Sequence, residues 1–402
     1  MTYNNAVKYI QNLHNSTGLG EHFKSLCSAF DSPHKRVKSI QICGDAGKTS
    51  CAQMLISIMT QSGSKVGSFS PYAHGDLRES IKIGDKEIPH FEFADIAKKV
   101  FDCAEKLYGD RSFSAEEVLL MIALIYFAHE ECDAVIFEHG FNDNTCYAIT
   151  PPILSVVTSI FEVASPSYLD DMIPRGTKET VTCIQHKQVY EAVSKTCAEV
   201  GCRLSLPLYA DLEVKKISLF NTRFTYRSAD YSLNAFSPCQ LLNAITVIEA
   251  AHALVRLGMS ISDDDIRKGL SNAHLPLMCR VITIEPTIIV ATVENADQLE
   301  ALIASLAQVN ELLHNKINLF VSRETVSLTA DLPSRLSSCA IECKNPQVLS
   351  GIDSHEFAPQ INGIISPIVN SEDTDYAALF IGEKGYTQEL EAQINKFLGR
   401  FA

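Results

Sequence analysis

The sequence predicts an α/β protein: a larger domain built on a mostly parallel sheet of the phosphate-loop type, followed by a smaller Rossmann-like α/β domain. Strand-like apolar runs alternate with helix-like runs along most of the chain, as in parallel sheets covered on both faces. A glycine loop at residues 44–50 joins the first buried strand to a helix. A second alternation begins near residue 283. We therefore predict domains at residues 1–282 and 283–402.

In the first domain, periodicity and capping signals define each element. The clearest helix is SAEEVLLMIALIYFAHEEC, where Ser114 stands at the N-cap and Glu117 at the capping-box position. Residues 3–30 have the spacing of two short helices. The other elements are the strands VKSIQIC, KVGSF, DAVIFEHG and ILSVVTSI, the helices TSCAQMLISIMTQSG and HKQVYEAVSKTCAEVG, antiparallel strands in VKKISLFNTRFTYRS, and two helices in SPCQLLNAITVIEAAHALVRLGMSISDDDIRKGL.

The second domain repeats the alternation on a smaller scale. About 115 residues are enough for a compact α/β domain with its own core. The predicted elements are the strand TIIVAT, the helix DQLEALIASLAQVNELL, the strands KINLFVS and YAALFIG, and a last helix from Tyr386.

Composition excludes several classes of partner. The 402 residues carry a net charge of -14 with a pI near 5.3, which argues against nucleic acid or an anionic membrane, because phosphate binding requires clustered Lys and Arg. No signal peptide and no run long enough to span a bilayer is evident. The 13 cysteines form no CxxC pair, so we expect free thiols in a reducing cytoplasm.

The glycine loop GDAGKTS matches GxxGK[ST] without the additional upstream glycine of the long phosphate-loop pattern, whose place is taken by Ile42. Glycines let backbone N–H groups turn toward an anion, and the following helix presents its positive end. Lys48 would reach the terminal phosphates, and a Thr49 or Ser50 hydroxyl would ligate magnesium. The predicted nucleotide-binding residues of the loop are Gly44, Asp45, Ala46, Gly47, Lys48, Thr49 and Ser50.

Two questions remain open at this loop. GK[ST] alone is common, and a plain strand–helix turn would account for it. Asp45 also places an anion inside an anion cradle, where it would repel phosphate unless it recruits the metal ion.

The order of motifs resembles the Mur-ligase superfamily, in particular its folylpolyglutamate synthase and dihydrofolate synthase branch. GDAGKTS is similar to the GTNGKxS loop of that branch, and VGSFSPYAHGDLRESI to its TSPH and ERI segments. CQLLNAITVI and LMCR are similar to its HQxxNAxxAL and PGR motifs. The resemblance covers almost the whole chain and implies an ATP-binding domain at residues 1–282 and the family's C-terminal domain at 283–402.

The resemblance implies an ADP-forming ligase that uses ATP to convert a carboxylate into an acyl phosphate, which the amine of an amino acid such as glutamate then attacks. The cofactors would be ATP and Mg²⁺, and the partners small molecules, a folate-like or other carboxylate and an amino acid. The oligomeric state stays open. By the same resemblance, Lys48 and Glu138 are catalytic; Thr49, Ser50, Ser70 and Glu138 hold the metal; and Gln240, Asn243, Arg280 and Asn295 lie at the nucleotide.

Structural roles compete with each of these assignments. Glu138 also fits a solvated strand end, Arg280 a surface ion pair, and Gln240 and Asn243 helix caps.

The departures from the family concentrate where the chemistry lies. The family's loop TN is Asp45-Ala46, and its metal-binding Asp-His pair falls at Val163-Ala164. The segment with the bridging lysine has no EK pair here, the aspartate and histidine of DGAHN are Ala291 and Glu294, and GFNDNT keeps few of the glycines of GLGGRLDATN. Replacement ligands would come from Asp45, Glu138, His139 or Glu162. The alternative is a catalytically inactive paralogue that serves as a nucleotide-binding, ligand-binding or protein-interaction module.

Overall fold

The computed structural model describes residues 1–13, 20–71, 76–108, 113–138, 151–163, 166–275, 279–370 and 376–399. It divides into two compact units. The first comprises residues 1–212 and 242–275, and the second comprises residues 213–241 and 276–402. The predicted domain boundary at 282/283 remains a prediction, because a division by compactness does not test which parts fold independently.

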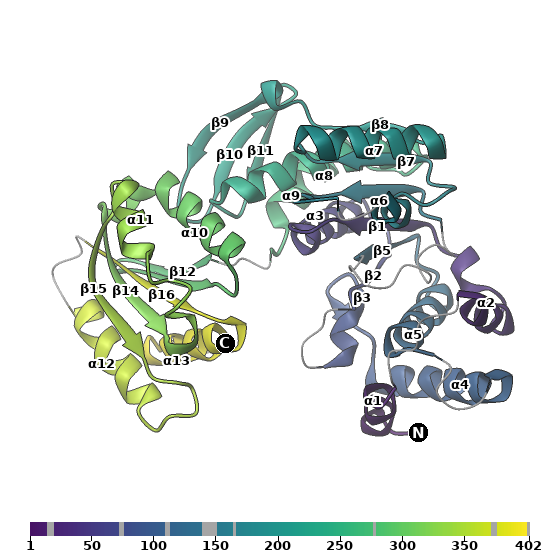
Figure 1. Ribbon diagram of the computed structural model, residues 1–402, viewed down its shortest axis with the longest axis horizontal. Coiled ribbons are helices and arrows are strands. Elements are labelled where there is room, and N and C mark those ends of the chain that lie inside the picture. The colour runs from purple at the N-terminus through teal and green to yellow at the C-terminus, as the bar shows by residue number, and fades with distance from the viewer. Residues whose placement is uncertain are drawn as a thin grey trace. The chain divides into compact units, whose positions relative to one another are not determined.

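The first unit contains an eight-stranded sheet with the order β4-β3-β2-β5-β1-β6-β7-β8, parallel from β2 to β8 (Figure 1). The strands β3 and β4 join its edge antiparallel. The elements with residues in this unit are α1 (Tyr3–Gln11), α2 (Gly20–Ala29), β1 (Ser39–Cys43), α3 (Lys48–Gln61), β2 (Val66–Phe69), β3 (Ile81–Ile83), β4 (Lys86–Glu87), α4 (His90–Tyr108), α5 (Ala115–His129), β5 (Ala134–Glu138), β6 (Leu154–Val157), α6 (Pro166–Met172), β7 (Glu179–Thr182), α7 (Lys187–Val200), β8 (Arg203–Ser205), α8 (Pro238–Arg256) and α9 (Asp263–Asn272).

Alternation along β5 decides which way its terminal glutamate points. Val135 and Phe137 lie in the apolar cluster formed with α1, α2, α4 and α5. Successive strand residues face opposite sides of a sheet, so Glu138 faces the other way. On that side its carboxylate accepts a hydrogen bond from Thr49 of α3.

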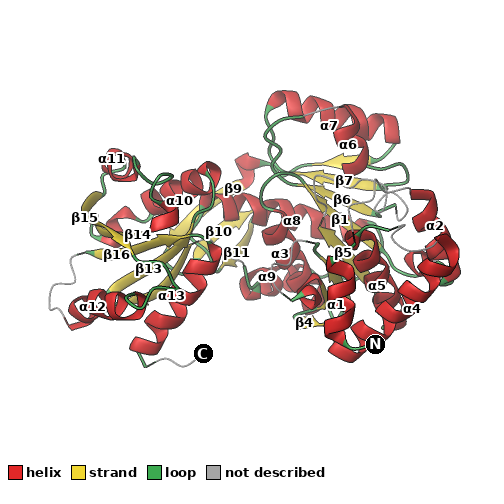
Figure 2. Cartoon of the chain, turned by 60° about the horizontal axis from the view of Figure 1, so that its bottom comes forward, coloured by secondary structure: helices red, strands yellow, loops and turns green. Residues whose placement is uncertain are grey.

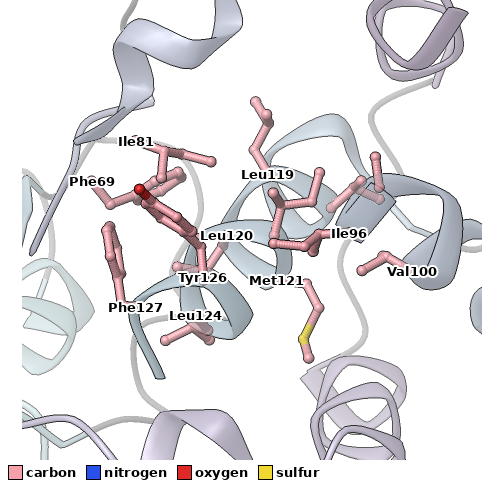
Figure 3. Packing of buried hydrophobic residues seen from close by; sticks show 14 of the residues in the cluster. Phe69, Ile81, Ile96, Val100, Leu119, Leu120, Met121, Leu124, Tyr126 and Phe127 are labelled. Atoms are coloured by element: carbon pink, nitrogen blue, oxygen red, sulfur yellow. The ribbon is translucent and has the colours of Figure 1, made fainter. Parts of the chain in front are cut away.

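The helix α5 confirms the prediction made from its capping signals. The Ser114 hydroxyl accepts from the Glu117 N–H, and the Glu117 carboxylate accepts from the Ser114 N–H at 2.8 Å. Ten of the 15 residues of α5 are buried, and Met121, Leu124 and Phe127 extend into the cluster (Figure 3). Burial on most sides of the helix follows from its near-continuous apolar sequence.

The second unit contains a five-stranded sheet of order β12-β13-β16-β14-β15, parallel except for β12, and a three-stranded antiparallel sheet β11-β10-β9 (Figure 1). One apolar cluster packs α10 and α11 on the larger sheet, and another packs α12 and α13 on its opposite face. The elements are β9 (Leu212–Ile217), β10 (Thr222–Tyr226), β11 (Ala229–Leu233), β12 (Cys279–Ile284), β13 (Thr287–Thr292), α10 (Ala296–Gln308), β14 (Lys316–Ser322), α11 (Leu332–Ser338), β15 (Glu342–Leu349), α12 (Phe357–Asn370), β16 (Ala377–Gly382) and α13 (Lys384–Phe397).

The helix α8 corrects the expectation that no run is long enough to span a bilayer. Its 19 residues meet the length and composition of a spanning helix. However, 61% of its apolar 18-residue stretch is buried inside the protein, as in the core helix of a soluble domain.

A hydrogen bond joins α1 to an ion pair in the segment that follows β2. Tyr3 donates its hydroxyl hydrogen bond to Asp76, and Arg78 contacts the same carboxylate at 2.7 Å. Burial alone would raise the pKa of Asp76, but the bonds from Arg78 and Tyr3 outweigh it and lower the pKa to about 2. The folded state therefore favours the charged carboxylate.

We expect Asp76→Asn to destabilise the protein in a pH-dependent way. A carboxyl group with a depressed folded pKa stabilises the fold above its unfolded value, 3.8, and loses that contribution as the pH falls toward about 2. Urea titrations of wild type and variant should give a constant difference in unfolding free energy above about pH 5 that shrinks below it. Asp85→Asn, at an exposed aspartate nearby, is the control; the prediction is wrong if both variants give the same pH profile.

Candidate active site

The carboxyl ends of four neighbouring parallel strands bring the predicted loop and its partners together. Phe69 pairs with Phe137 and Ile42 with Glu138, so Ser70, Glu138 and Gly44 stand at the same edge of the sheet. The strand β6 lies on the far side of β1 (Figure 2). There Cys43 pairs with Val157. Ligands of open α/β sheets bind at this edge.

The loop requires glycine at two positions. Gly44 has φ +124°, and a Cβ there would lie 2.4 Å from Thr158 Oγ1. Gly47 has φ +89°, and a Cβ there would lie 2.7 Å from Asn243 Oδ1. Both the backbone conformation and the close approach therefore exclude other side chains. The contact with Gly47 also places Asn243 against the loop. That Asn243 binds the nucleotide remains a prediction.

Lys48 opens α3 and folds over the loop. Its ammonium nitrogen donates to the carbonyl oxygens of Gly44 at 2.7 Å and Asp45 at 3.3 Å. Burial lowers the pKa of Lys48, and the nearby negative groups, Glu138 and Asp45 among them, oppose the shift. The positive charge thus lies at the N-terminal end of α3, where the helix dipole also favours an anion.

Glu138 and Thr49 form the acidic side of the site. Thr49 Oγ1 donates to Glu138 Oε2 at 2.7 Å, and Glu138 is only 5% exposed. Burial raises the pKa of Glu138, although the Thr49 bond and the charges of Lys48 and Lys82 act in the opposite direction. The protein compensates the charge of this buried carboxylate only in part. Together, the Glu138 carboxylate and the Thr49 hydroxyl are oxygen donors of the kind that Mg²⁺ binds.

Other predicted metal residues lie at the same edge. Ser50 is buried in the first turn of α3, and Ser70 follows β2, with its backbone N–H donating to the Ser80 carbonyl. Of the suggested replacement ligands, Glu162 is exposed, and His139 lies outside the described residues. No cluster of three His, Cys, Asp or Glu residues suited to a metal occurs among the described positions.

Three predicted nucleotide residues lie in the second unit, where Arg280 and Asn295 have structural partners. Arg280 forms an ion pair with Glu391 at 2.5 Å, and Asn295 caps α10 by accepting from the Gln298 N–H at 3.0 Å. Gln240 is 9% exposed and lines a cavity of about 30 Å³ together with Cys279. Their predicted roles at the nucleotide remain predictions.

Asp45 is held by partners that the sequence did not indicate. Its Oδ2 accepts from the Phe161 N–H at 2.6 Å, and its Oδ1 accepts from the Tyr168 hydroxyl. The backbone N–H groups of Asp45 and Ala46 donate to the Ser159 carbonyl at 2.7 and 3.3 Å. No local pattern in SIFEVASPSYLD marks these contacts in advance.

The chain is similar in sequence to folate-related synthases, at low identity. A folylpolyglutamate synthase of Lacticaseibacillus casei is 24% identical over 334 residues, 77% of each chain. A dihydrofolate synthase/folylpolyglutamate synthase of Escherichia coli (strain K12) is 27% identical over 311 residues, 74% of this chain and 70% of that protein. A probable bifunctional folylpolyglutamate synthase/dihydropteroate synthase of Haloferax volcanii is 23% identical, and the match spans 46% of its length. No family model matches the chain.

The comparison with solved structures identifies the fold. A solved folylpolyglutamate synthetase from Lactobacillus casei superposes with a TM-score of 0.76 over 99% of both chains, at 19% identity. The chain has the folylpolyglutamate synthase fold. A solved folylpolyglutamate synthase complex with AMPPCP and folate also matches, with a TM-score of 0.74 over 98% of this chain and 100% of that one, at 18% identity. The predicted fold class is confirmed, and so is the resemblance to folylpolyglutamate synthases and dihydrofolate synthases.

Proposed function

We propose that this protein is an ATP-dependent ligase of the folylpolyglutamate synthase type. It would convert a carboxylate, folate-like or other, into an acyl phosphate and join it to an amino acid such as glutamate. The observation that carries the proposal is the arrangement of Lys48, Thr49 and Glu138 around the glycine loop, at the carboxyl ends of the parallel strands. We further propose small-molecule substrates and a cytoplasmic location.

The residues of the loop suit the phosphate end of ATP. The N-terminus of α3 and the Lys48 ammonium supply positive charge, and Gly44 and Gly47 let the backbone approach closely. Glu138, Thr49 and the nearby Ser50 and Ser70 are the oxygen ligands that would hold Mg²⁺. When bound, the metal offsets the negative charge of the phosphates.

In phosphoryl transfer the protein contributes mainly by positioning the reacting groups and by stabilising the charge on the phosphates. Lys48 would hold the transferred phosphoryl group, and burial of Glu138 keeps its carboxylate in a fixed orientation toward α3. Lys48 is therefore the residue on which the chemistry depends most.

A catalytically inactive paralogue is the second candidate. Two N–H groups of the loop already bond to the Ser159 carbonyl, and Ala291, at the position of the family's aspartate, is fully buried in an apolar cluster. Such a protein would retain a nucleotide or ligand site, or a protein-interaction surface, without ligase turnover.

Calorimetry with Mg-ATP, followed by a turnover assay, tests the proposal. A ligase should bind Mg-ATP and release ADP only when a pteroate and glutamate are both present. Absence of binding at millimolar ATP would contradict the ligase proposal. Binding without ADP release across a panel of carboxylates and amino acids would favour the inactive paralogue.

A further inference from the structure

Asp45 is a negative charge built into a loop that is proposed to hold phosphate. Like charges at close range disfavour binding, and the low polarity of a half-buried site strengthens the repulsion. The position of the carboxylate, and the groups that hold it there, decide how much of that repulsion an anion meets.

The carboxylate is turned toward the β6 side of the loop. Both of its oxygens accept from donors outside the loop, the Phe161 N–H at 2.6 Å and the Tyr168 hydroxyl. The Thr49–Glu138 pair lies on the other side, because β1 stands between β5 and β6 in the sheet. Hydrogen bonds to a charged acceptor are the stronger kind, so two of them define one orientation.

The segment that holds Asp45 is itself fixed to the loop. Thr158 donates both its N–H and its hydroxyl to the Cys43 carbonyl, at 2.8 and 2.9 Å. Ser159 then pairs with Ala46 in an antiparallel bridge. The Phe161 N–H therefore reaches Asp45 from a backbone that is already in register with the loop.

Tyr168 belongs to α6, a helix anchored by the apolar core. Its neighbours Leu169, Met172 and Ile173 pack in a cluster with Cys43 and Val157, at the ends of β1 and β6. Burial and the adjacent Asp45 carboxylate raise the pKa of the Tyr168 hydroxyl, so it stays protonated and remains a donor. The donor is thus rigidly placed and permanently available.

We propose that Tyr168 is a positioning residue for the anion site: together with the Phe161 N–H it holds the Asp45 carboxylate on the β6 side, away from the phosphate that Lys48 and α3 receive. This rests on the proposed function, since it presumes that the loop binds a phosphate group. It assigns Asp45 neither to the metal nor to the nucleotide.

Removal of the Tyr168 hydroxyl tests the proposal without removing the charge of Asp45. In Tyr168→Phe the carboxylate keeps one donor and gains freedom to approach the loop. We expect calorimetry to show about fivefold to tenfold weaker binding of tripolyphosphate and Mg-ATP at 50 mM salt. The defect should shrink at 500 mM salt, because salt screens repulsion between partly exposed charges.

Asp45→Asn provides the matched background. Asparagine carries no charge that Tyr168 would have to hold away from the phosphate. Asp45→Asn/Tyr168→Phe should therefore bind tripolyphosphate and Mg-ATP as tightly as Asp45→Asn alone. Tyr190→Phe, at a partly exposed tyrosine of α7, should bind as the wild type does. Thermal unfolding of every variant separates loss of the site from loss of the fold.

Two results with Tyr168→Phe would overturn the inference. It is overturned by wild-type affinity in Tyr168→Phe, or by a defect that persists in the Asp45→Asn background and is equal at both salt concentrations. Weaker Mg-ATP binding by Asp45→Asn would make Asp45 a metal ligand instead. If the wild type binds tripolyphosphate but not Mg-ATP, the nucleotide part of the proposed function fails alone. If tripolyphosphate does not bind, the inference fails.

Discussion

Replacing Lys48 by methionine is expected to weaken Mg-ATP binding at least about 100-fold and to remove any ligase turnover. Lys48 is the cation that the loop itself supplies, and its ammonium lies 2.7 Å from the Gly44 carbonyl at the start of α3. Methionine keeps the length and much of the apolar stem but cannot donate. The substitution therefore removes the positive charge beside the bound phosphate and should leave the packing of α3 unchanged.

Calorimetry with Mg-ATP measures this effect, and Lys65→Met is the matched control. Lys65 follows the far end of α3 and pairs with Glu130 at 2.7 Å, so its loss should leave the affinity unchanged. Lys48→Arg should restore binding in part, because arginine keeps the charge with a different geometry. Equal affinities of Lys48→Met and the wild type would show that the loop holds no phosphate.

The sequence was most informative where local chemistry decides the structure. Ser114 and Glu117 predicted the start of α5 because a capping box is a contact within one helical turn. The strand–loop–helix order around Gly44 and Gly47 likewise follows from neighbouring residues. The helix α3 begins at Lys48, within the predicted loop, as a phosphate loop requires.

Proline concealed elements of the second unit. The strand β15 carries Pro346 and lies at the edge of its sheet, next to an irregularity in its pairing with β14. A sheet tolerates proline at edge strands and at bulges. Pro346, which argues against a strand in the sequence, is therefore compatible with the edge position of β15. The helix α12 contains Pro367 and was also not predicted, because proline normally interrupts the helical pattern.

Contacts between distant residues were beyond prediction from periodicity. The donors to Asp45 lie 116 and 123 residues away in the sequence, and one of them is a backbone N–H with no side-chain signature. The sequence could therefore pose the question of a carboxylate in an anion cradle but could not answer it. Arg280 is the converse case: a surface ion pair was one of its two readings from the sequence, and the geometry shows that the partner is Glu391.

Gly269→Ala is expected to lower the free energy of unfolding by about 3 kcal/mol, because it forces α9 away from α3. A Cβ at Gly269 would lie 2.3 Å from the Cα of Ile58 and 2.7 Å from its backbone nitrogen. Backbone atoms cannot swing aside as a flexible side chain does, so one helix must shift. The shift would also break the hydrogen bond that Ser57 donates to the Gly269 carbonyl at 2.7 Å.

Chemical denaturation of the purified chain measures the loss, and Gly363→Ala is the matched control. Gly363 lies within α12, and a Cβ there meets nothing within 4 Å, so alanine should be neutral or stabilise by up to about 1 kcal/mol through its higher helix propensity. Because α3 carries Lys48 at its other end, Gly269→Ala should also weaken Mg-ATP binding, whereas Gly363→Ala should not. A stable Gly269→Ala protein with unchanged affinity would mean that α9 can move without disturbing α3, and that the loop does not depend on this helix contact.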